Sequence, residues 1–261
     1  MNDIRNHNRE AWNKQVERGN QWTVPISPEM IEAARLGKLD IYLTPTKPIP
    51  RNWLPSLEKT DILCLASGGG QQGPILAAAG ANVTVYDNSP RQLDQDRFVA
   101  HREGLPIKIV EGDMRDLSVF GDASFDLIIN PVSINFIPEV LSVWREGYRV
   151  LRPGGSLLAG FSNPVRYLFE QTAYDRGKLE ISYSLPYADT EILANNEITQ
   201  RAENGEPLEF SHSLKDIIGG QIDAGFVIVG FYEDRYPPNT DLLGEYMPTF
   251  FATRSLKPAK E

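Results

Sequence analysis

The sequence predicts an α/β protein, because short apolar runs alternate with helical segments along most of the chain. The runs 62–66, 83–86 and 107–110 have the length and apolar character of buried parallel strands. A clear helix start follows the second run, where Ser89 is placed as the cap and Gln92 stands three residues later. Such alternation gives right-handed crossovers, so we expect a three-layer sandwich of helices around a mostly parallel sheet.

Seven strands are predicted, and the last two differ from the others in their connection. Too few residues lie between them for a helical crossover of normal length, so we expect them to pair antiparallel. The result is a seven-stranded, mostly parallel sheet with an antiparallel last strand. The predicted strands are residues 62–66, 83–86, 107–110, 126–130, 156–161, 226–232 and 249–255, and the helices between them are 74–79, 90–103, 138–149 and 213–224.

The central segment of the sheet, Asp61 to Asp87, combines a strand, a glycine-rich turn, a helix and a second strand. Gly68, Gly70 and Gly73 satisfy the pattern G-x-G-x-x-G. Glycine lets a ligand approach the backbone closely, and the amides at the start of the helix attract electron-rich groups. A carboxylate at the tip of the second strand suits two ribose hydroxyls. The segment therefore predicts a nucleoside cofactor, in preference to an ordinary strand-to-helix turn.

Two units are predicted along the chain: a helical N-terminal lid over residues 1–55 and a cofactor-binding domain over residues 56–261. The proline-rich stretch Thr44 to Pro55 separates them, because it suits neither a regular helix nor a central strand. Trp22 of the lid is a candidate acceptor contact, although packing of the lid onto the second unit is the better explanation for any one of the aromatic residues in this region. An insertion of about 162–212 is too long for a normal connection, and its tyrosines favour an ordered cover over the site.

Composition narrows the function classes. The formal net charge is −9 and basic residues are scattered, which disfavours nucleic acid as a partner and favours a small molecule. The single cysteine, Cys64, excludes an internal disulfide and a cysteine-cluster metal site, and we expect no bound metal. No segment has the length of a membrane span and the polar start is unlike a secretory signal, so a cytoplasmic protein is expected. A homodimer is compatible with this composition.

The order of these motifs resembles the class I S-adenosylmethionine-dependent methyltransferases, from about Asp61 to the C-terminus. The matching stretches are LCLASGGG, VYD, EGDM, FDLIINP and the helix ending RVLRPGG, followed by the paired last strands. The resemblance implies a Rossmann-like fold, S-adenosylmethionine as cofactor and methyl transfer to a small-molecule acceptor. It also implies cofactor contacts from Ala66, Ser67, Gly68, Gly70, Asp87, Asn88, Asp113, Met114 and Asn130.

Individual roles follow from the same resemblance. Asp87 is expected to bind the ribose hydroxyls, with Asn88 beside it. Asp113 is expected to accept the adenine amino hydrogen, and Met114 to pack on the adenine ring. Asn130 is expected to lie near the transferred methyl group.

The first motif departs from the family pattern at two positions. The family commonly has an acid two residues before the first glycine, where this chain has Cys64, and Ala66 replaces that glycine. This departure keeps open a second interpretation, a cofactor-binding sensor or subunit without turnover. A third is an NAD(P)-dependent oxidoreductase, because Tyr174 and Lys178 have the Y-x-x-x-K spacing of short-chain dehydrogenases.

Acceptor contacts are predicted from position rather than from a motif. Asn135 and Phe136 follow the fourth predicted strand at the edge that carries the cofactor motifs. His212 is the best candidate for a catalytic base, because it stands where the cover meets the next helix and histidine titrates near neutral pH. A histidine that bonds locally at a helix end is the competing explanation.

Overall fold

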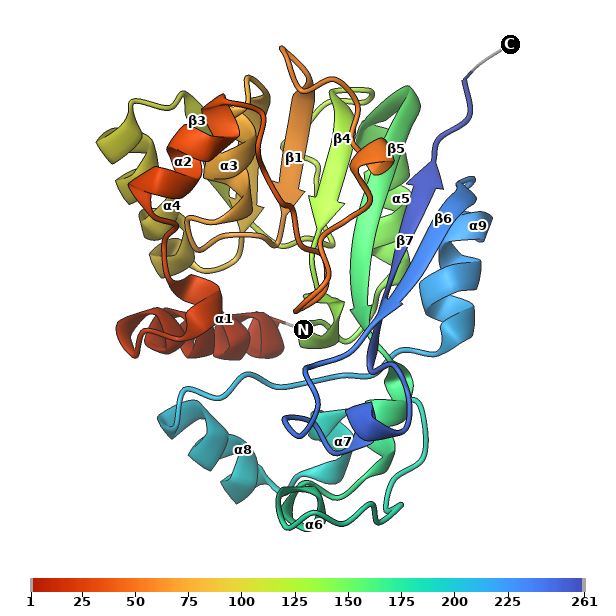
Figure 1. The fold of residues 1–261 in the computed structure, drawn as a ribbon. Helices are drawn as coiled ribbons and strands as arrows, with labels where there is room; N and C mark the ends of the chain where they lie inside the picture. The colour runs from red at the N-terminus through yellow and green to blue at the C-terminus, as the bar shows by residue number, and fades with distance from the viewer. Residues whose placement is uncertain (1, 260–261) are drawn as a thin grey trace.

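The computed structural model describes residues 2–259 and contains the predicted seven-stranded sheet, in the order β3-β2-β1-β4-β5-β7-β6 (Figure 1). Strand β7 is antiparallel to both of its neighbours, while the other six strands share one direction. The predicted fold class is therefore confirmed. The strands are β1 (Asp61–Leu65), β2 (Asn82–Asp87), β3 (Ile107–Glu111), β4 (Phe125–Asn130), β5 (Leu151–Ser162), β6 (Val227–Asp234) and β7 (Phe250–Leu256).

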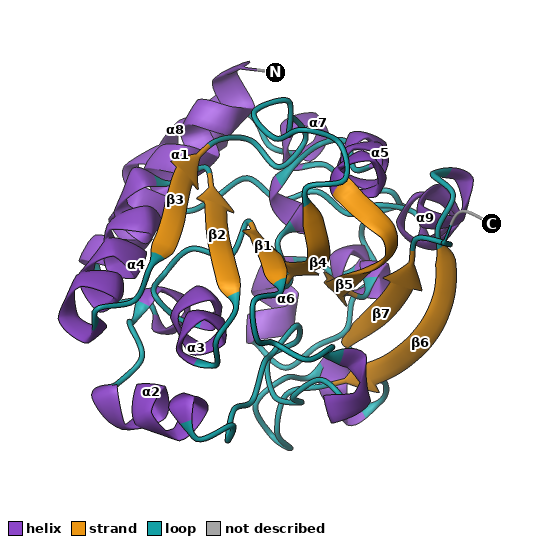
Figure 2. Ribbon diagram, turned by 90° about the horizontal axis from the view of Figure 1, so that it is seen from above, coloured by secondary structure: helices purple, strands orange, loops and turns teal. Residues whose placement is uncertain are grey.

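Helices cover both faces of the sheet (Figure 2). Along β1, Ile62 and Cys64 join the hydrophobic core under α2, α3 and α4, while Leu63 and Leu65 join the core under α5. Successive side chains of a strand point to opposite faces, which is why a strand covered on both sides is apolar throughout. The helices are α1 (Asn2–Glu17), α2 (Pro28–Arg35), α3 (Gln72–Ala78), α4 (Pro90–Glu103), α5 (Leu141–Val150), α6 (Gln171–Asp175), α7 (Asp189–Ile192), α8 (Asn195–Glu203) and α9 (Gly220–Asp223).

Two predicted elements have different bounds in the structure. Strand β5 begins at Leu151 rather than Ser156, because Leu151 pairs with Phe125 before an irregularity in the register with β4. The predicted helix 213–224 is instead a π-helical turn, Lys215–Gly219, followed by the short α9. The indole N–H of Trp144 donates to the Asp216 carbonyl at 2.9 Å, and the Gly220 amide reaches back to Lys215. The tertiary contact with Trp144 thus competes with a regular α-helical hydrogen bond.

The helix cap predicted at Ser89 is half formed. Ser89 Oγ accepts from the Gln92 amide at 3.1 Å, as a capping residue does. The Ser89 amide, however, donates to the Asp87 carboxylate at 2.8 Å rather than to the Gln92 side chain. The Gln92 side chain therefore takes no part in the helix cap.

Helix α1 lies against the lower edge of the sheet, between the sheet and the segment that carries α6, α7 and α8 (Figure 1). Asn8 connects the two sides: its Nδ2 donates to the carbonyls of Phe136 and Leu208, and its Oδ1 accepts from the Leu208 amide. The proposed lid and the proposed cover are thus joined to one another as well as to the sheet. The outermost residues of the two predicted units, 1 and 260–261, lie outside the described part of the chain.

No helix within residues 2–259 is both long and apolar enough to cross a membrane.

Candidate active site

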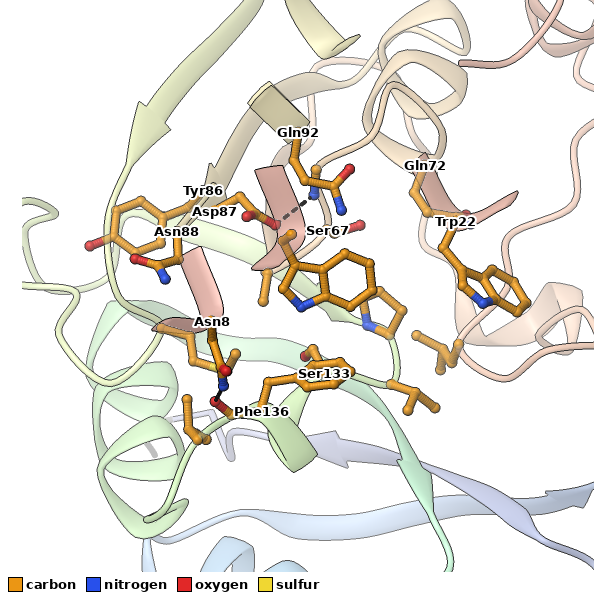
Figure 3. A pocket seen from close by; sticks show the side chains of 18 of the residues that line it. Asn8, Trp22, Ser67, Gln72, Tyr86, Asp87, Asn88, Gln92, Ser133 and Phe136 are labelled. Atoms are coloured by element: carbon orange, nitrogen blue, oxygen red, sulfur yellow. Dashed lines mark hydrogen bonds between the residues drawn. The ribbon is translucent and has the colours of Figure 1, made fainter. Parts of the chain in front are cut away.

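A cavity opens at the carboxyl ends of β1, β2, β3 and β4, with α1 along one side (Figure 3). Most of the predicted site residues reach it although they come from distant parts of the chain. Those that line it are Trp22, Ala66, Ser67, Gly68, Asp87, Asn88, Asp113, Met114 and Phe136. The parallel strands explain this convergence, because their carboxyl ends meet at one edge of the sheet.

The glycine-rich turn forms the floor of the cavity after β1. A Cβ atom on Gly68 would lie 2.8 Å from the Gln92 Cβ and 3.2 Å from the Asp87 carboxylate, so only glycine fits there. Gly70, in contrast, does not line the cavity: it has a φ of +71° and its Cα faces the Gln95 carbonyl of α4. Gly70 shapes the turn from beneath.

Asp87, at the tip of β2, is held by the turn that it faces. One carboxylate oxygen accepts from the Gly68 amide at 3.0 Å, and the other from the Ser89 amide at 2.8 Å. Burial raises the pKa of this carboxyl group, and these backbone hydrogen bonds oppose the rise. A carboxylate has about four lone-pair directions, so acceptor capacity remains for a ligand.

Asp113 follows β3 and forms a two-oxygen ion pair with Arg115. Arg115 Nε lies 3.0 and 3.1 Å from the two Asp113 oxygens. Burial acts to raise the pKa of Asp113, but the hydrogen bonds and charge of Arg115 outweigh burial and lower it. Asp113 is therefore ionised at neutral pH and can accept a hydrogen bond from an amino group.

The backbone beside Asp113 approaches Tyr86 closely. A Cβ atom on Gly112 would lie 1.9 Å from the Tyr86 hydroxyl, which itself donates to the Asp116 carbonyl at 2.7 Å. Gly112 and Tyr86 both line the cavity next to Met114. Asp113 therefore offers an acceptor at the end of the cavity where the Gly112 backbone and Tyr86 lie close together.

Asn130 and Asn135 do not line the cavity. Asn130 is fully buried at the end of β4, where its Nδ2 donates to the Leu65 carbonyl and to Ser133 Oγ. The backbone carbonyl of Asn135 accepts from the Phe210 amide, and so connects this loop to the insertion. Both residues hold the loop after β4 in place, and Ser133 and Phe136 of that loop face the cavity.

His212 is also absent from the cavity lining. Its side chain is buried, and Nε2 lies 2.9 Å from the carbonyl of Ile134 in the short 3-10 helix η3 (Ile134–Phe136). Burial lowers the pKa of this imidazole, against the opposing effect of the Ile134 carbonyl. The structure thus ties His212 to the loop after β4 through a contact between residues 78 apart in sequence, which is neither a position in the cavity nor a local helix-end bond.

Comparison with known proteins agrees with this geometry. Residues 63–159 match the family model of a methyltransferase domain. The uncharacterized methyltransferase YbaJ of Bacillus subtilis (strain 168) is 52% identical over 257 residues, which are 98% of this chain and 100% of that protein. This chain belongs to the S-adenosylmethionine-dependent methyltransferases. S-adenosylmethionine is its cofactor.

Solved structures share the fold of this methyltransferase at low sequence identity. The S-adenosylmethionine-dependent methyltransferase from Mesorhizobium loti has a TM-score of 0.61 at 19% identity, covering 78% of this chain and 94% of its own. A putative S-adenosylmethionine-dependent methyltransferase from Listeria monocytogenes has a TM-score of 0.62 at 18% identity, covering 81% and 95%. These similarities concern the fold alone.

The dehydrogenase alternative is wrong. Helix α6 ends at Asp175 and Gly177 follows with a φ of +77°, so Tyr174 and Lys178 do not share a helix. The Tyr174 hydroxyl bonds to Asp241 and to the Leu243 amide, and neither Tyr174 nor Lys178 lines the cavity. The Y-x-x-x-K spacing in this methyltransferase is therefore a coincidence of sequence.

Sequence reasoning missed several residues of the methyltransferase cavity, among them Arg5 and Asn8 of α1, and gave no partner for Trp12. Arg5 Nε donates to Asn88 Oδ1 at 2.9 Å, and Asn88 Nδ2 donates back to the Arg5 carbonyl at 3.0 Å. Trp12 packs edge-on against Phe136 with ring centroids 5.1 Å apart. No sequence motif predicts such contacts, because they depend on where α1 packs against the rest of the fold.

Gln92 provides a test of whether the site fits the cofactor. Its side chain lines the cavity and is 6% exposed, yet its Oε1 has no hydrogen-bond partner among the described residues. A buried carbonyl oxygen without a donor is costly. A hydroxyl or amino group of a ligand beside Gly68 and Asp87 would satisfy it, so the residues present fit a nucleoside cofactor with an amino-acid part.

Ala66→Gly is expected to stabilise the methyltransferase by about 0.5–1 kcal/mol. Ala66 has a φ of +47°, a left-handed conformation that strains a residue with a Cβ atom. Differential scanning calorimetry should show a melting temperature roughly 1–4 °C higher. Ala78→Gly, at the last residue of α3, is the matched control and should lower the melting temperature instead. A lower melting temperature for Ala66→Gly would contradict the strain.

Proposed function

We propose that this methyltransferase moves the methyl group of S-adenosylmethionine to a small-molecule acceptor. The observation that carries the proposal is the joint cover: α1 lines the cavity while Asn8 fastens it to the insertion at Leu208. A covered cavity admits a small molecule more readily than a folded macromolecule. In this proposal residues 1–55 cover the acceptor directly, and the insertion of about 162–212, which contributes no residue to the cavity lining, covers the site from behind by holding α1 in place.

The residues proposed to hold the cofactor lie after β1, β2 and β3 and at the start of α4. Asp87 accepts hydrogen bonds from the ribose hydroxyls, and Asp113 accepts one from the adenine amino group. The turn Ala66 to Gly68 lies under the amino-acid part, and Met114 packs on the ring. Gln92 accepts a hydrogen bond from a hydroxyl or amino group.

The sulfonium of S-adenosylmethionine supplies a methyl group that is already activated. The task left to the protein is to align the acceptor with that methyl group and to exclude water. The loop after β4, held by Asn130, and the rings of Trp12 and Phe136 perform this positioning. His212 acts through η3 in this proposal, because its imidazole is bonded to the Ile134 carbonyl.

Calorimetry followed by a labelling assay tests the proposal. We expect the purified protein to bind S-adenosylhomocysteine and not NAD or NADP. With S-adenosylmethionine labelled at the methyl group, a cell extract separated by size should then carry label in its small-molecule fraction. Label only in protein or RNA would overturn the small-molecule proposal, and cofactor binding without any label would support the non-catalytic alternative.

A homodimer and a cytoplasmic location remain predictions. Light scattering of the purified protein and fractionation of cells would test them.

A further inference from the structure

Charge is distributed unevenly along the cavity. Asp87 is the last residue of β2, Asp113 and Arg115 follow β3, and Arg5 of α1 bonds to Asn88 beside β2. In the strand order β3-β2-β1-β4-β5-β7-β6, all four lie on the β3 side of β1. Among the described residues no Asp, Glu, Lys, Arg or His lines the cavity on its β4 and β7 side.

Flat apolar side chains line this uncharged side. Phe250 at the start of β7 packs edge-on against Tyr236, with ring centroids 5.2 Å apart. Tyr42 and Trp22 line the cavity beside α3 and the glycine-rich turn: the Tyr42 amide donates to Gln72 Oε1 at 3.3 Å, and the Trp22 carbonyl lies next to Gly69. Figure 3 shows Trp22 and Gln72 on the side of the cavity opposite Tyr86 and Asn88, with Ser67 between them. Aromatic side chains bind flat ligands through stacked and edge-on contacts.

The charged groups that act on Tyr236, which are Arg166, Asp241 and Asp234, are turned to other partners. Arg166 lies over the Phe250 ring at 5.2 Å and pairs with Asp241 at 3.4 Å. Asp234 accepts from the backbone amides of Thr46 and Lys47. None of these charged side chains lines the cavity, so a charged acceptor group would be left without a counter-charge.

We infer that the acceptor is an uncharged aromatic molecule, which stacks among Trp22, Tyr42, Tyr236 and Phe250 and presents an unprotonated nitrogen or an electron-rich ring carbon to the methyl group. The inference rests on the proposed function and deepens it. It assigns the uncharged side of the cavity to the acceptor and the charged side to the cofactor.

The chemistry balances without a protein base. The nucleophilic atom forms a bond to the methyl carbon as the bond from that carbon to sulfur breaks, and sulfur keeps the electron pair as a neutral thioether. A proton released from the methylated atom passes to water. Burial raises the pKa of the Tyr42 and Tyr236 phenols, so both stay protonated at neutral pH and neither can take that proton. An acceptor whose nucleophile must first be ionised by the enzyme is therefore a poor fit.

Calorimetry on the protein saturated with S-adenosylhomocysteine tests the inference with three probes that share one ring system: indole, indole-3-carboxylate and tryptamine. We expect indole to bind roughly tenfold or more tightly than either charged probe, because the cavity offers no partner for a charge. Tyr236→Ala should weaken indole binding about fivefold, and Tyr236→Phe should retain it. Tyr246→Ala is the control, since Tyr246 is 74% exposed and does not line the cavity.

The outcomes distinguish a failure of the proposed function from a failure of the inference about the acceptor. Failure to bind S-adenosylhomocysteine would remove the cofactor site and with it the proposed function. Cofactor binding together with equal or tighter binding of a charged probe, or with no binding of indole, would overturn the inference alone. Equal indole affinity in Tyr236→Ala and Tyr246→Ala would also overturn it.

Discussion

Asp87→Ala is expected to weaken the binding of S-adenosylhomocysteine by about 100-fold or more. In the proposed complex the carboxylate accepts two ribose hydroxyls, and a hydrogen bond to a charged group is worth about 1.5–3 kcal/mol. The variant also frees the Gly68 and Ser89 amides that Asp87 now holds. Loss of the ligand contacts and relaxation of the glycine turn act in the same direction. Calorimetric titration measures the combined effect.

Two further variants identify the source of the Asp87 effect. Asp87→Asn keeps one carbonyl oxygen and should weaken binding less than Asp87→Ala. Asp94→Ala is the matched control: Asp94 is 53% exposed on α4, pairs with Arg97 and does not line the cavity. Its affinity should equal that of the unaltered protein. An Asp87→Ala protein that is folded by circular dichroism and binds with unchanged affinity would remove Asp87 from the cofactor site.

The sheet could be predicted from sequence because its signals are local. Ile62 to Leu65 are apolar on both faces of β1, and the glycines that follow interrupt the run at once. A run of four such residues identifies a covered strand without knowledge of its neighbours. The motifs that follow these strands lie together, because the carboxyl ends of parallel strands meet at one edge of the sheet.

The cover and the acceptor side could not be predicted in the same way. Asn8 and Leu208 are 200 residues apart, and their hydrogen bonds exist only once α1 has docked. The chemistry of His212 and its position near a loop favour a catalytic base, but its bond to the Ile134 carbonyl is a tertiary contact that the sequence does not reveal. Gln92 matches a capping box in sequence, and Asp87 occupies the amide that the box requires. Each of these contacts depends either on a partner that is distant in sequence or on competition between two acceptors for one backbone amide.

Asp96 is a second buried carboxylate beside the glycine-rich turn. It is fully buried on α4, and one oxygen accepts from the Gly69 amide at 3.0 Å, while the other has no partner among the described residues. Burial raises the pKa of Asp96 to about 8; the adjacent Gly70 and Gly69 backbone amides and the charge of Arg97 oppose the rise, and the charge of Asp87 adds to it. Burial raises the pKa of the Cys64 thiol of β1, and the charge of Asp96 adds to the rise, so the thiol stays protonated.

The raised pKa makes the stability of the fold depend on pH. Between the ordinary value of 3.8 and about 8, the folded protein holds a proton on Asp96 that the unfolded chain releases. The stabilisation is complete below pH 4 and is lost as the pH rises towards 8. Part of the fall in unfolding free energy between pH 5 and pH 8 should therefore come from this one residue.

Asp96→Asn is expected to remove that part of the pH dependence. The amide keeps an oxygen for the Gly69 amide and cannot ionise, so relative to the unaltered protein it should gain about 3 kcal/mol between pH 5 and pH 8, or roughly 5–10 °C in melting temperature. Asp96→Leu cannot ionise either but leaves the Gly69 amide unpaired, so it should be about 1–3 kcal/mol less stable than Asp96→Asn at every pH. Thermal unfolding of the three proteins from pH 5 to pH 8 separates the lost charge from the lost hydrogen bond. Parallel curves for Asp96→Asn and the unaltered protein would show that Asp96 does not titrate in this range.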